Sequence, residues 1–345
     1  MEKALIAMSG GVDSSVAAYL MQQAGFDCAG ATMQLWENTQ TADAQNVAQR
    51  LGMDFFVFDY TSDFSREVVD KFITCYEAGG TPNPCVDCNR CLKFGALLDK
   101  ALSMGYDKIA TGHYATIEKD PQTGRLLLFR AADGNKDQTY FLASLTQQQL
   151  AHIAFPLGAL NKETVRQIAQ EQGFLNANKR DSQDICFIPD GDYLAFMKQY
   201  TGKNYPAGDF LDLAGNVVGK HCGAVGYTIG QRKGLGLAMG EPVYVCAKDM
   251  QNNTVTVGSN DDLFRTTLRA SNWNWIPFPT LEAPIRVTAK IRYRHIEQPA
   301  TVYPEENGFA RVEFDTPQRA ITTGQAVVLY DGNMVVGGGT ITEVL

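Results

Sequence analysis

The stretch Ala4-Leu5-Ile6-Ala7-Met8-Ser9-Gly10-Gly11-Val12-Asp13-Ser14-Ser15 decides the fold of this chain. Its apolar first half is typical of a buried parallel strand, and residues 16–21 suit a helix. Gly10 and Gly11 allow the backbone to approach an anion closely. Successive amides of such a turn form a concave nest at the positive end of a helix dipole, and the serines add hydroxyl donors. The stretch therefore predicts a loop that binds phosphate or pyrophosphate.

This loop is not a Walker phosphate loop, because it lacks the spacing Gly-x-x-x-x-Gly-Lys-Ser/Thr and its lysine. Ser9 to Ser15 instead resembles the pyrophosphate motif of the N-type ATP pyrophosphatases, which split ATP between its α and β phosphates. The resemblance implies bound ATP and a Mg²⁺ ion beside Asp13. The structural alternative is a plain strand-to-helix turn with a serine cap.

Composition limits the classes of protein that fit. The chain has 345 residues, enough for two or three domains, and a net charge of −8, which argues against a generally basic nucleic-acid binder. No apolar run approaches membrane-spanning length, and the N-terminal one breaks at Ser9, too short for a secretory signal. We therefore expect a cytoplasmic protein without a membrane partner. Its eight cysteines then act as reduced thiols, metal ligands or core residues rather than disulfides.

The first 200 residues alternate strands with helices. Strands over 28–34, 55–59 and 108–111 and helices over 41–51 and 63–78 predict an α/β domain with a Rossmann-like parallel sheet. Two further helices are predicted over 161–172, capped at its start by Asn161, and over 192–200. Ligands of such sheets lie outside the carboxyl ends of the strands. This places Met33 where an adenine would lie and Gly112 beside the nucleotide. The segments 114–118 and 126–130 predict an antiparallel hairpin added to that sheet.

Beyond Thr201 helical periodicity gives way to glycine and short strands. We predict a catalytic domain over 1–200, a small central mostly-β domain over 201–266 and a C-terminal β-barrel over 267–345. A glycine-rich segment over 221–236 contains Arg232 and Lys233 and fits either phosphate-backbone contact or a tight β corner. Four basic residues at alternate positions predict one basic strand face for RNA or solvent: Arg286, Lys290, Arg292 and Arg294.

Cysteines cluster after two prolines. Cys85, Cys88 and Cys91 recur every three residues, a spacing that lets thiolates converge on one metal centre. Zinc usually needs a fourth ligand, and no later Cys-x-x-Cys supplies one. A helix beginning here would also favour a nucleophilic thiolate. Cys186, in a short apolar segment, fits a core position by itself.

Six motifs together resemble the tRNA-specific 2-thiouridylases, the MnmA/TrmU family, over nearly the whole chain. They are Ser-Gly-Gly-Val-Asp-Ser-Ser, Asn-Pro-x-x-x-Cys-Asn ending at Asn89, Ala-Thr-Gly-His-Tyr, Lys-Asp-Gln, Ile-Cys-Phe-Ile and Gly-Gln-Arg-Lys-Gly-Leu-Gly. The resemblance implies replacement of the C2 oxygen of the wobble uridine in tRNA by sulfur. ATP adenylates the oxygen, AMP leaves, and a sulfur nucleophile attacks C2.

The resemblance also implies site residues. Those that would hold ATP are Ala7, Met8, Ser9, Gly10, Gly11, Val12, Asp13, Ser14, Met33 and Gly112. Those that would meet the target base, flipped out of its stack, are Asn83, Pro84 and Cys85. The tRNA-contacting positions are Lys136, Asp137, Gln138, Arg292 and Tyr293. Cys88 matches the nucleophile, and Cys186 matches the cysteine that carries a persulfide. A cysteine desulfurase, a relay protein or free sulfide would supply sulfur, and we expect a monomer.

The chain departs from the family at Cys85, where the best-described members have an aspartate. Three thiolates at a nucleotide site resemble related tRNA thiolases that hold a 4Fe-4S cluster with one open iron. We therefore expect Cys85, Cys88 and Cys186 to bind such a cluster, with Cys91 either a fourth ligand or unrelated to it.

Two other classes of protein share parts of the pattern. An amidotransferase-like or argininosuccinate-type ligase would use the same loop on a small substrate, but leaves Cys88 and Cys186 without a role. A zinc-stabilised RNA-binding protein with a vestigial loop would release no AMP.

Overall fold

The computed structural model describes residues 1–36, 39–177, 179 and 185–345. Five parallel strands form its first sheet, in the order β3-β2-β1-β4-β7. They are β1 (Lys3–Ala7), β2 (Asp27–Gln34), β3 (Phe55–Asp59), β4 (Lys108–Thr111) and β7 (Ile153–Ala154). The predicted Rossmann-like sheet is confirmed, and β1 lies at its centre.

Both faces of this sheet are buried, as a parallel sheet requires. Ala4 and Ile6 of β1 face one core, which α1 (Val12–Gln23), α2 (Ala42–Arg50) and α8 (Lys162–Glu171) cover. Leu5 faces the other core, together with side chains of α6 (Leu97–Ser103) and α7 (Gln147–Ala151). That second core also contains barrel residues such as Tyr330, so the sheet and the barrel share buried apolar surface.

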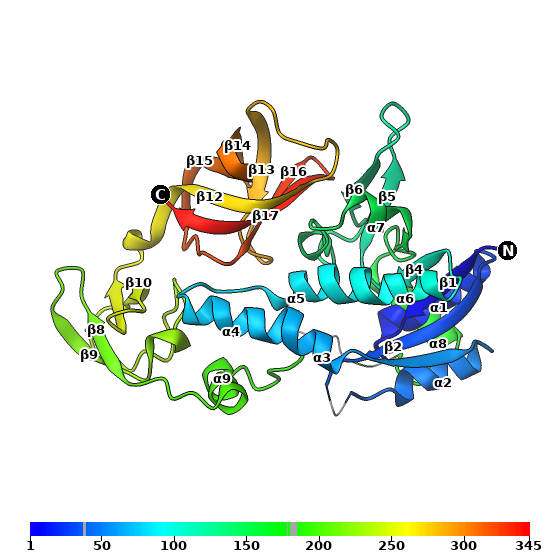
Figure 1. Ribbon diagram of the computed structural model, residues 1–345, viewed down its shortest axis with the longest axis horizontal. Helices are drawn as coiled ribbons and strands as arrows, with labels where there is room; N and C mark the ends of the chain where they lie inside the picture. The colour runs from blue at the N-terminus through cyan, green and yellow to red at the C-terminus, as the bar shows by residue number, and fades with distance from the viewer. Residues whose placement is uncertain (37–38, 178, 180–184) are drawn as a thin grey trace.

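Two long helical segments connect the sheet to the rest of the molecule. The first comprises α3 (Thr61–Phe64), the π-helix η1 (Ser65–Val69) and α4 (Asp70–Glu77), where one helix over 63–78 was predicted. The second comprises α5 (Pro84–Asp87), the π-helix η2 (Cys88–Ala96) and α6. The two segments pack against each other beneath the barrel (Figure 1).

The central part is a four-stranded sheet in the order β10-β11-β8-β9. Its strands are β8 (Gly208–Leu211), β9 (Val217–His221), β10 (Tyr244–Asp249) and β11 (Thr254–Gly258). Helix α9 (Tyr193–Thr201) precedes it. The Asp192 side chain caps α9 by accepting from Ala195 N, and Gly202 ends it with φ +67°, so the predicted helix over 192–200 is confirmed within one residue.

Six antiparallel strands form the C-terminal barrel, which closes because β12 pairs with both β15 and β17. They are β12 (Phe264–Trp275), β13 (Ile285–Lys290), β14 (Gln298–Pro304), β15 (Ala310–Arg319), β16 (Ala326–Asp331) and β17 (Met334–Val344). Short 3₁₀ helices connect elements: η3 (Thr139–Phe141), η4 (Ala224–Gly226), η5 (Asp261–Leu263) and η6 (Glu306–Gly308).

The hairpin of β5 (Ala115–Lys119) and β6 (Leu126–Arg130) corrects one prediction. It does not extend the parallel sheet. Strand β6 instead pairs with β17 at Phe129 and Met334, and Arg130 N donates to Asn333 O. Hydrogen bonding to a partner two hundred residues later cannot be read from local periodicity.

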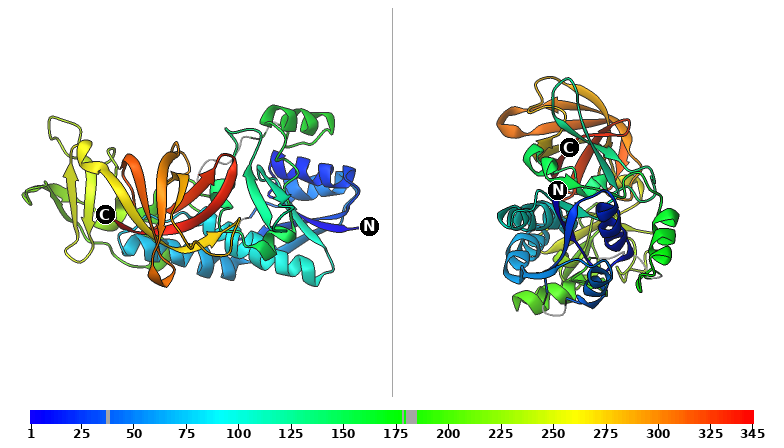
Figure 2. Two further views of the ribbon diagram at one scale, coloured as in Figure 1. Left: turned by 90° about the horizontal axis from the view of Figure 1, so that it is seen from above. Right: turned by 90° about the vertical axis from the view of Figure 1, so that its right-hand side faces the viewer.

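Seen from a second direction, the parallel sheet and the four-stranded sheet lie at opposite ends of the molecule, with the barrel between them (Figure 2). Within the described residues, no helix has the length and apolar content needed to cross a membrane.

Candidate active site

The loop between β1 and α1 has the geometry of an anion site. Gly10 has φ +73°, a conformation that favours glycine, and its neighbour Gly11 caps α1. Ser9 N donates to Ser14 Oγ over 3.2 Å, while the hydroxyls of Ser14 and Ser15 both donate to Gly11 O. These bonds fix the first turn, so the positive end of the twelve-residue helix α1 opens beside Ser9.

Asp13, in the first turn of α1, has two partners from distant segments. Lys162 Nζ lies 2.7 Å from Oδ1 and 2.8 Å from Oδ2, and the Tyr114 hydroxyl donates to Oδ1 over 2.8 Å. Lys162 is the first residue of α8, and only 9% of it is exposed. The sequence showed Asn161 as a helix cap but gave no sign of this ion pair.

A Mg²⁺ ion at Asp13 would share the carboxylate with Lys162, whose Nζ lies 2.7 Å from Oδ1 and 2.8 Å from Oδ2. Mg²⁺ is usually held by one or two carboxylates plus substrate phosphates and water, so a single carboxylate beside the phosphate loop is sufficient. Asp13 would hold the ion, which when bound shields the charge of the phosphates.

Gly112 must be glycine because β4 ends against the loop. A Cβ there would lie 2.6 Å from both Asp13 C and Ser14 N. Met33, near the end of β2, is half-buried. It packs on the core that contains Leu5 and also on the apolar cluster that contains Cys88. The predicted nucleotide residues thus gather at the carboxyl edge of the sheet.

Asn176 is a loop-supporting residue that sequence reasoning missed. Its buried side chain donates to Gly10 O over 3.1 Å and to Ser15 Oγ over 2.9 Å. In the sequence Asn176 is a single asparagine after a helix, and such a residue does not specifically indicate contact with the phosphate loop. Its bonds tie the turn after α8 to the phosphate loop.

Cys88 and the residues that flank Cys186 pack in one apolar cluster. Cys88 packs against the cluster that contains Phe187 and Ile188, and Ile185 packs there as well. Cys85 and Cys186 reach the surface although protein surrounds much of each thiol, and Cys88 is half-buried. Burial by the surrounding protein raises the pKa of all three thiols, that of Cys88 to about 11. The free thiols are therefore protonated at neutral pH.

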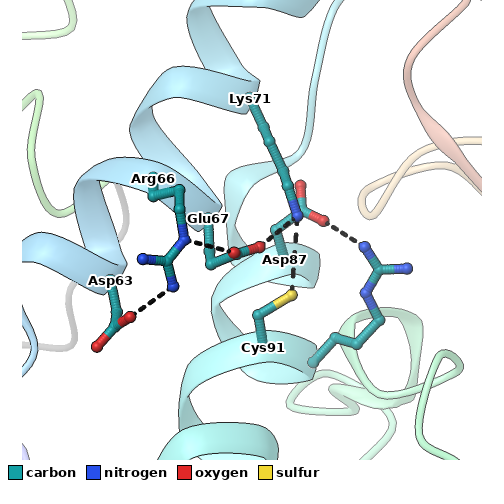
Figure 3. Close-up of polar contacts among 7 residues, drawn as sticks. Asp63, Arg66, Glu67, Lys71, Asp87 and Cys91 are labelled. Atoms are coloured by element: carbon teal, nitrogen blue, oxygen red, sulfur yellow. Dashed lines mark hydrogen bonds and ion pairs between the residues drawn. The ribbon is translucent and has the colours of Figure 1, made fainter.

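Cys91 has a different neighbour. Its sulfur lies 4.0 Å from Lys71 Nζ, which also pairs with Glu67 over 2.7 Å (Figure 3). The close-up shows Cys91 within an ionic network between the two helical segments, where Arg90 pairs with Asp87. Cys91 therefore belongs to a helix contact.

The expected 4Fe-4S site does not fit this arrangement. In residues 1–36, 39–177, 179 and 185–345, no three His, Cys, Asp or Glu side chains form a group that could hold a metal ion. Cys85, Cys88 and Cys186 influence one another's titration, but they do not converge as ligands, and Cys91 is turned to Lys71. The cluster expected from the resemblance is therefore not supported by the described residues.

The barrel supports the loop that precedes the cysteines. Gln325 Nε2 donates to Thr81 O over 2.8 Å and to Pro82 O over 3.2 Å, and Thr81 N donates to Thr323 O. Asn83 and Pro84 follow directly, and the Pro84 ring is buried. Segments some 240 residues apart thus fix the predicted base-contacting residues, a relation the sequence did not indicate.

The predicted tRNA-contacting residues divide into open and buried groups. Asp137 is 7% exposed, and its carboxylate accepts from Thr139 Oγ1 and from backbone amides. Gln138 Oε1 accepts from Tyr114 N. Lys136 and Tyr293 are half-exposed, and Tyr293 packs on Phe141 with ring centroids 4.4 Å apart.

The predicted basic face does not form. Strand β13 ends at Lys290, so Arg292 and Arg294 lie in the turn beyond it. Arg292 is largely buried and donates to Ile229 O, Ala320 O and Thr322 Oγ1, while Arg286 is paired with Asp315. The alternating pattern of basic residues continues in the sequence beyond Lys290, where strand β13 ends.

The fold and loop define a nucleotide-binding α/β protein with two β-rich parts. Residues 2–190 match the family described as tRNA methyl transferase HUP domain, 194–259 its PRC-barrel domain, and 265–341 the aminomethyltransferase β-barrel domain. A tRNA-specific 2-thiouridylase MnmA of Clostridioides difficile (strain 630) is 47% identical over 357 residues, covering 100% of this chain and 99% of that relative.

A relative with the same name from Acetivibrio thermocellus is 48% identical over 355 residues and 99% of each chain. The chain belongs to the tRNA-specific 2-thiouridylase family. Among solved structures, a 4-thiouridine synthetase–RNA complex with bound ATP aligns at 16% identity and a TM-score of 0.35, covering 57% of this chain and 50% of that one.

Proposed function

We propose that this tRNA-uridine 2-sulfurtransferase adenylates the C2 oxygen of the wobble uridine and then replaces that oxygen by sulfur. The observation that carries the proposal is the joint placement of two features. The glycine-serine loop stands at the carboxyl edge of the parallel sheet, and Met33 at that edge packs in the cluster that holds Cys88. A nucleotide on the loop is thus adjacent to a thiol site.

The loop binds the phosphates of ATP. Backbone amides between Ala7 and Ser14, the Ser9 hydroxyl and the α1 dipole face the pyrophosphate end, while the Ser14 hydroxyl holds the turn by donating to Gly11 O. Met33 and Gly112 flank the nucleoside end. Attack by the uridine O2 on the α phosphorus forms the O–P bond and releases pyrophosphate. The C2 oxygen then leaves with AMP instead of as hydroxide.

Sulfur arrives as a persulfide on Cys186. Its terminal sulfur attacks C2 and expels AMP, leaving the base joined to Cys186 through a disulfide. The Cys88 thiolate then attacks Cys186 Sγ, the S–S bond breaks, and the thiolated uridine leaves with the terminal sulfur. A Cys88–Cys186 disulfide remains, and an external thiol reduces it. A cysteine desulfurase or a relay protein supplies this sulfur from a persulfide of its own, which already has the oxidation level required. Free sulfide can supply it only by attacking the Cys88–Cys186 disulfide before that is reduced: the S–S bond breaks, Cys88 leaves as a thiolate and the persulfide forms on Cys186.

The substrate is a tRNA whose target base is extruded towards Asn83, Pro84 and Cys85, because a stacked base cannot reach the loop. Lys136 and Tyr293 are half-exposed and bind the RNA. Asp137, Gln138 and Arg292 hold the segments that carry them through their own hydrogen bonds. The enzyme acts as a cytoplasmic monomer.

The test is a reaction with ATP, unmodified tRNA transcript and a persulfide source. Wild-type protein should form AMP and 2-thiouridine in equal amounts. Cys88→Ser and Cys186→Ser should lose at least 10²-fold of the thiouridine, on the order expected for removing a covalent catalyst, while binding ATP normally. Cys222→Ser, an exposed thiol of the central part, is the matched control and should retain activity. Thiouridine formation by both catalytic variants would contradict the proposal.

A further inference from the structure

The glycine-rich segment of the central part makes a turn over residues 230–234 that its backbone and uncharged side chains build. Gly230 has φ +85° and Gly234 has φ +77°, conformations that favour glycine. Gly230 N donates to Val245 O over 2.8 Å, and Val245 N donates to Gln231 O over 3.0 Å, so the turn is fixed to β10. Leu235, which is 6% exposed, packs on the core of the central sheet. The 230–234 turn is therefore a rigid corner.

The two cations of the 230–234 turn take no part in building it. Arg232 and Lys233 are exposed, and in the part of the chain that the structure describes their side chains make no hydrogen bond or ion pair. Other exposed arginines are paired with a carboxylate, as Arg286 is with Asp315. Two adjacent cations repel each other and attract an anion. A corner alone does not require them, so their charge is available to a partner.

Two arginines of the barrel region hold this turn from its other side. Arg292 donates to Ile229 O over 3.1 Å and to Ala320 O over 3.0 Å, and Arg319 donates to Gly230 O over 3.5 Å. A Cβ on Gly230 would lie 2.8 Å from the Ala320 Cβ, so turn and barrel approach each other closely. These contacts fix the position of the turn relative to the barrel segment that contains Arg292.

That barrel segment carries further positive charge. Tyr293, a proposed RNA contact, is half-exposed, and Arg294 is exposed and makes no ion pair among the described residues. Burial lowers the pKa of His295, and the charges of three cations lower it further: Arg292, Arg319 and Lys290. Cations thus gather where the central part meets the barrel, although the whole chain has a net charge of −8. Such a local concentration of positive charge favours a polyanion as partner.

We propose that Arg232 and Lys233 bind phosphates of the tRNA backbone and form, with Tyr293 and Arg294, one docking surface across the central part and the barrel. The inference deepens the proposed function and rests on it for tRNA as the substrate. Contacts to phosphates release counterions and read no base sequence, so the turn positions the body of the RNA. The turn carries none of the reacting groups, and it therefore contributes to tRNA affinity rather than to the chemical steps.

The experiment measures the dissociation constant of an unmodified tRNA transcript by filter binding at about 50 to 200 mM KCl. In Arg232→Gln with Lys233→Gln we expect the low-salt dissociation constant to rise about five- to tenfold. The slope of log Kd against log salt should fall by about 1.5, because each lost phosphate contact removes about 0.7–0.9. Arg232→Lys with Lys233→Arg should retain both values. Lys3→Gln with Lys100→Gln removes the same charge from exposed positions of β1 and α6 and should leave the slope unchanged.

An unchanged slope in the folded Arg232→Gln, Lys233→Gln protein would overturn the inference, as would an equal fall in the Lys3→Gln, Lys100→Gln protein. Thiouridine formation at saturating tRNA is measured on the same proteins and should proceed at the wild-type rate. A wild-type protein that binds tRNA but makes no thiouridine contradicts the proposed function, while the salt dependence of binding still decides the role of the 230–234 turn.

Discussion

Lys162 Nζ contacts both carboxylate oxygens of Asp13, at 2.7 and 2.8 Å, and thereby joins α8 to the phosphate loop across 149 residues of sequence. The pair is only partly solvated, with side-chain exposures of 11% for Lys162 and 29% for Asp13. It neutralises the one acidic side chain of the loop. The loop is therefore pre-formed around a charge pair before any nucleotide binds.

Lys162→Met should destabilise the protein, because it removes the cation from the Asp13 carboxylate while the hydrogen bond from the Tyr114 hydroxyl, at 2.8 Å, stays. Loss of one partner of a partly buried pair is expected to lower the free energy of unfolding by about 1–3 kcal/mol. Urea unfolding without ATP measures it, with Lys162→Arg as the charge-retaining control. Equal stability of the wild type and Lys162→Met would contradict the role given to this pair.

Gly112→Ala should abolish tight ATP binding. Its Cβ would sit 2.6 Å from the Asp13 and Ser14 backbone, so the loop must shift away from β4. We expect the ATP dissociation constant to rise at least tenfold, which corresponds to about 1.4 kcal/mol. Calorimetric titration measures it, and Gly134→Ala is the control, because a Cβ there meets nothing within 4 Å. Equal affinities in the two variants would show that the close approach does not matter.

Gln325→Ala tests whether the barrel positions the base-contacting loop. The change removes the donor to Thr81 O and Pro82 O, and each such bond contributes about 1 kcal/mol. We expect thiolation to slow about five- to tenfold while ATP affinity stays at the wild-type value. Gln167→Ala, on the exposed surface of α8, is the matched control. A parallel loss of ATP binding would instead indicate general misfolding.

Lys248 gives the protein a pH-dependent stability. Burial lowers the pKa of its ammonium from 10.5 to about 8, although Nζ donates to Tyr227 O over 2.7 Å. Between these two values the unfolded chain binds more protons than the folded one, so stability from this group rises with pH. Urea unfolding at pH 7.5 and 9.5 should show a steeper rise for wild type than for Lys248→Met. Identical pH slopes would contradict the burial of this ammonium.

Iron analysis distinguishes the persulfide route from a cluster route. Protein purified without oxygen should contain no stoichiometric iron or acid-labile sulfide and should still thiolate tRNA from a persulfide source. Cys85→Ser should then lose much less activity than Cys88→Ser, since Cys85 contacts the target base but carries no sulfur in the proposed route. Stoichiometric iron and sulfide, with activity lost on their removal, would restore the cluster that the thiol geometry does not support.

Local sequence predicted the parts of this molecule that local chemistry determines. The apolar run before Ser9, the glycines of the loop and the cap at Asn161 act within a few residues, and the corresponding strand, turn and helix are present. Recognition of the six motifs supplied the site residues that periodicity alone could not.

The relations that were missed join distant segments. Lys162 reaches Asp13, Gln325 reaches Thr81, and β6 pairs with β17, each through a contact that depends on tertiary packing. The prediction of a basic strand face was wrong because β13 ends at Lys290, and the residue composition around Lys290 does not mark that end. The expected cluster is not supported by a group of ligands in the described residues.

The most direct test of the account follows the oxygen that leaves C2. A tRNA whose wobble uridine carries ¹⁸O at C2 is converted by the enzyme with unlabelled ATP and a persulfide source, and the AMP is analysed by mass spectrometry. Adenylation of the C2 oxygen predicts one ¹⁸O atom in each AMP formed with each 2-thiouridine. Thiouridine formation with unlabelled AMP would contradict adenylation as the activation step.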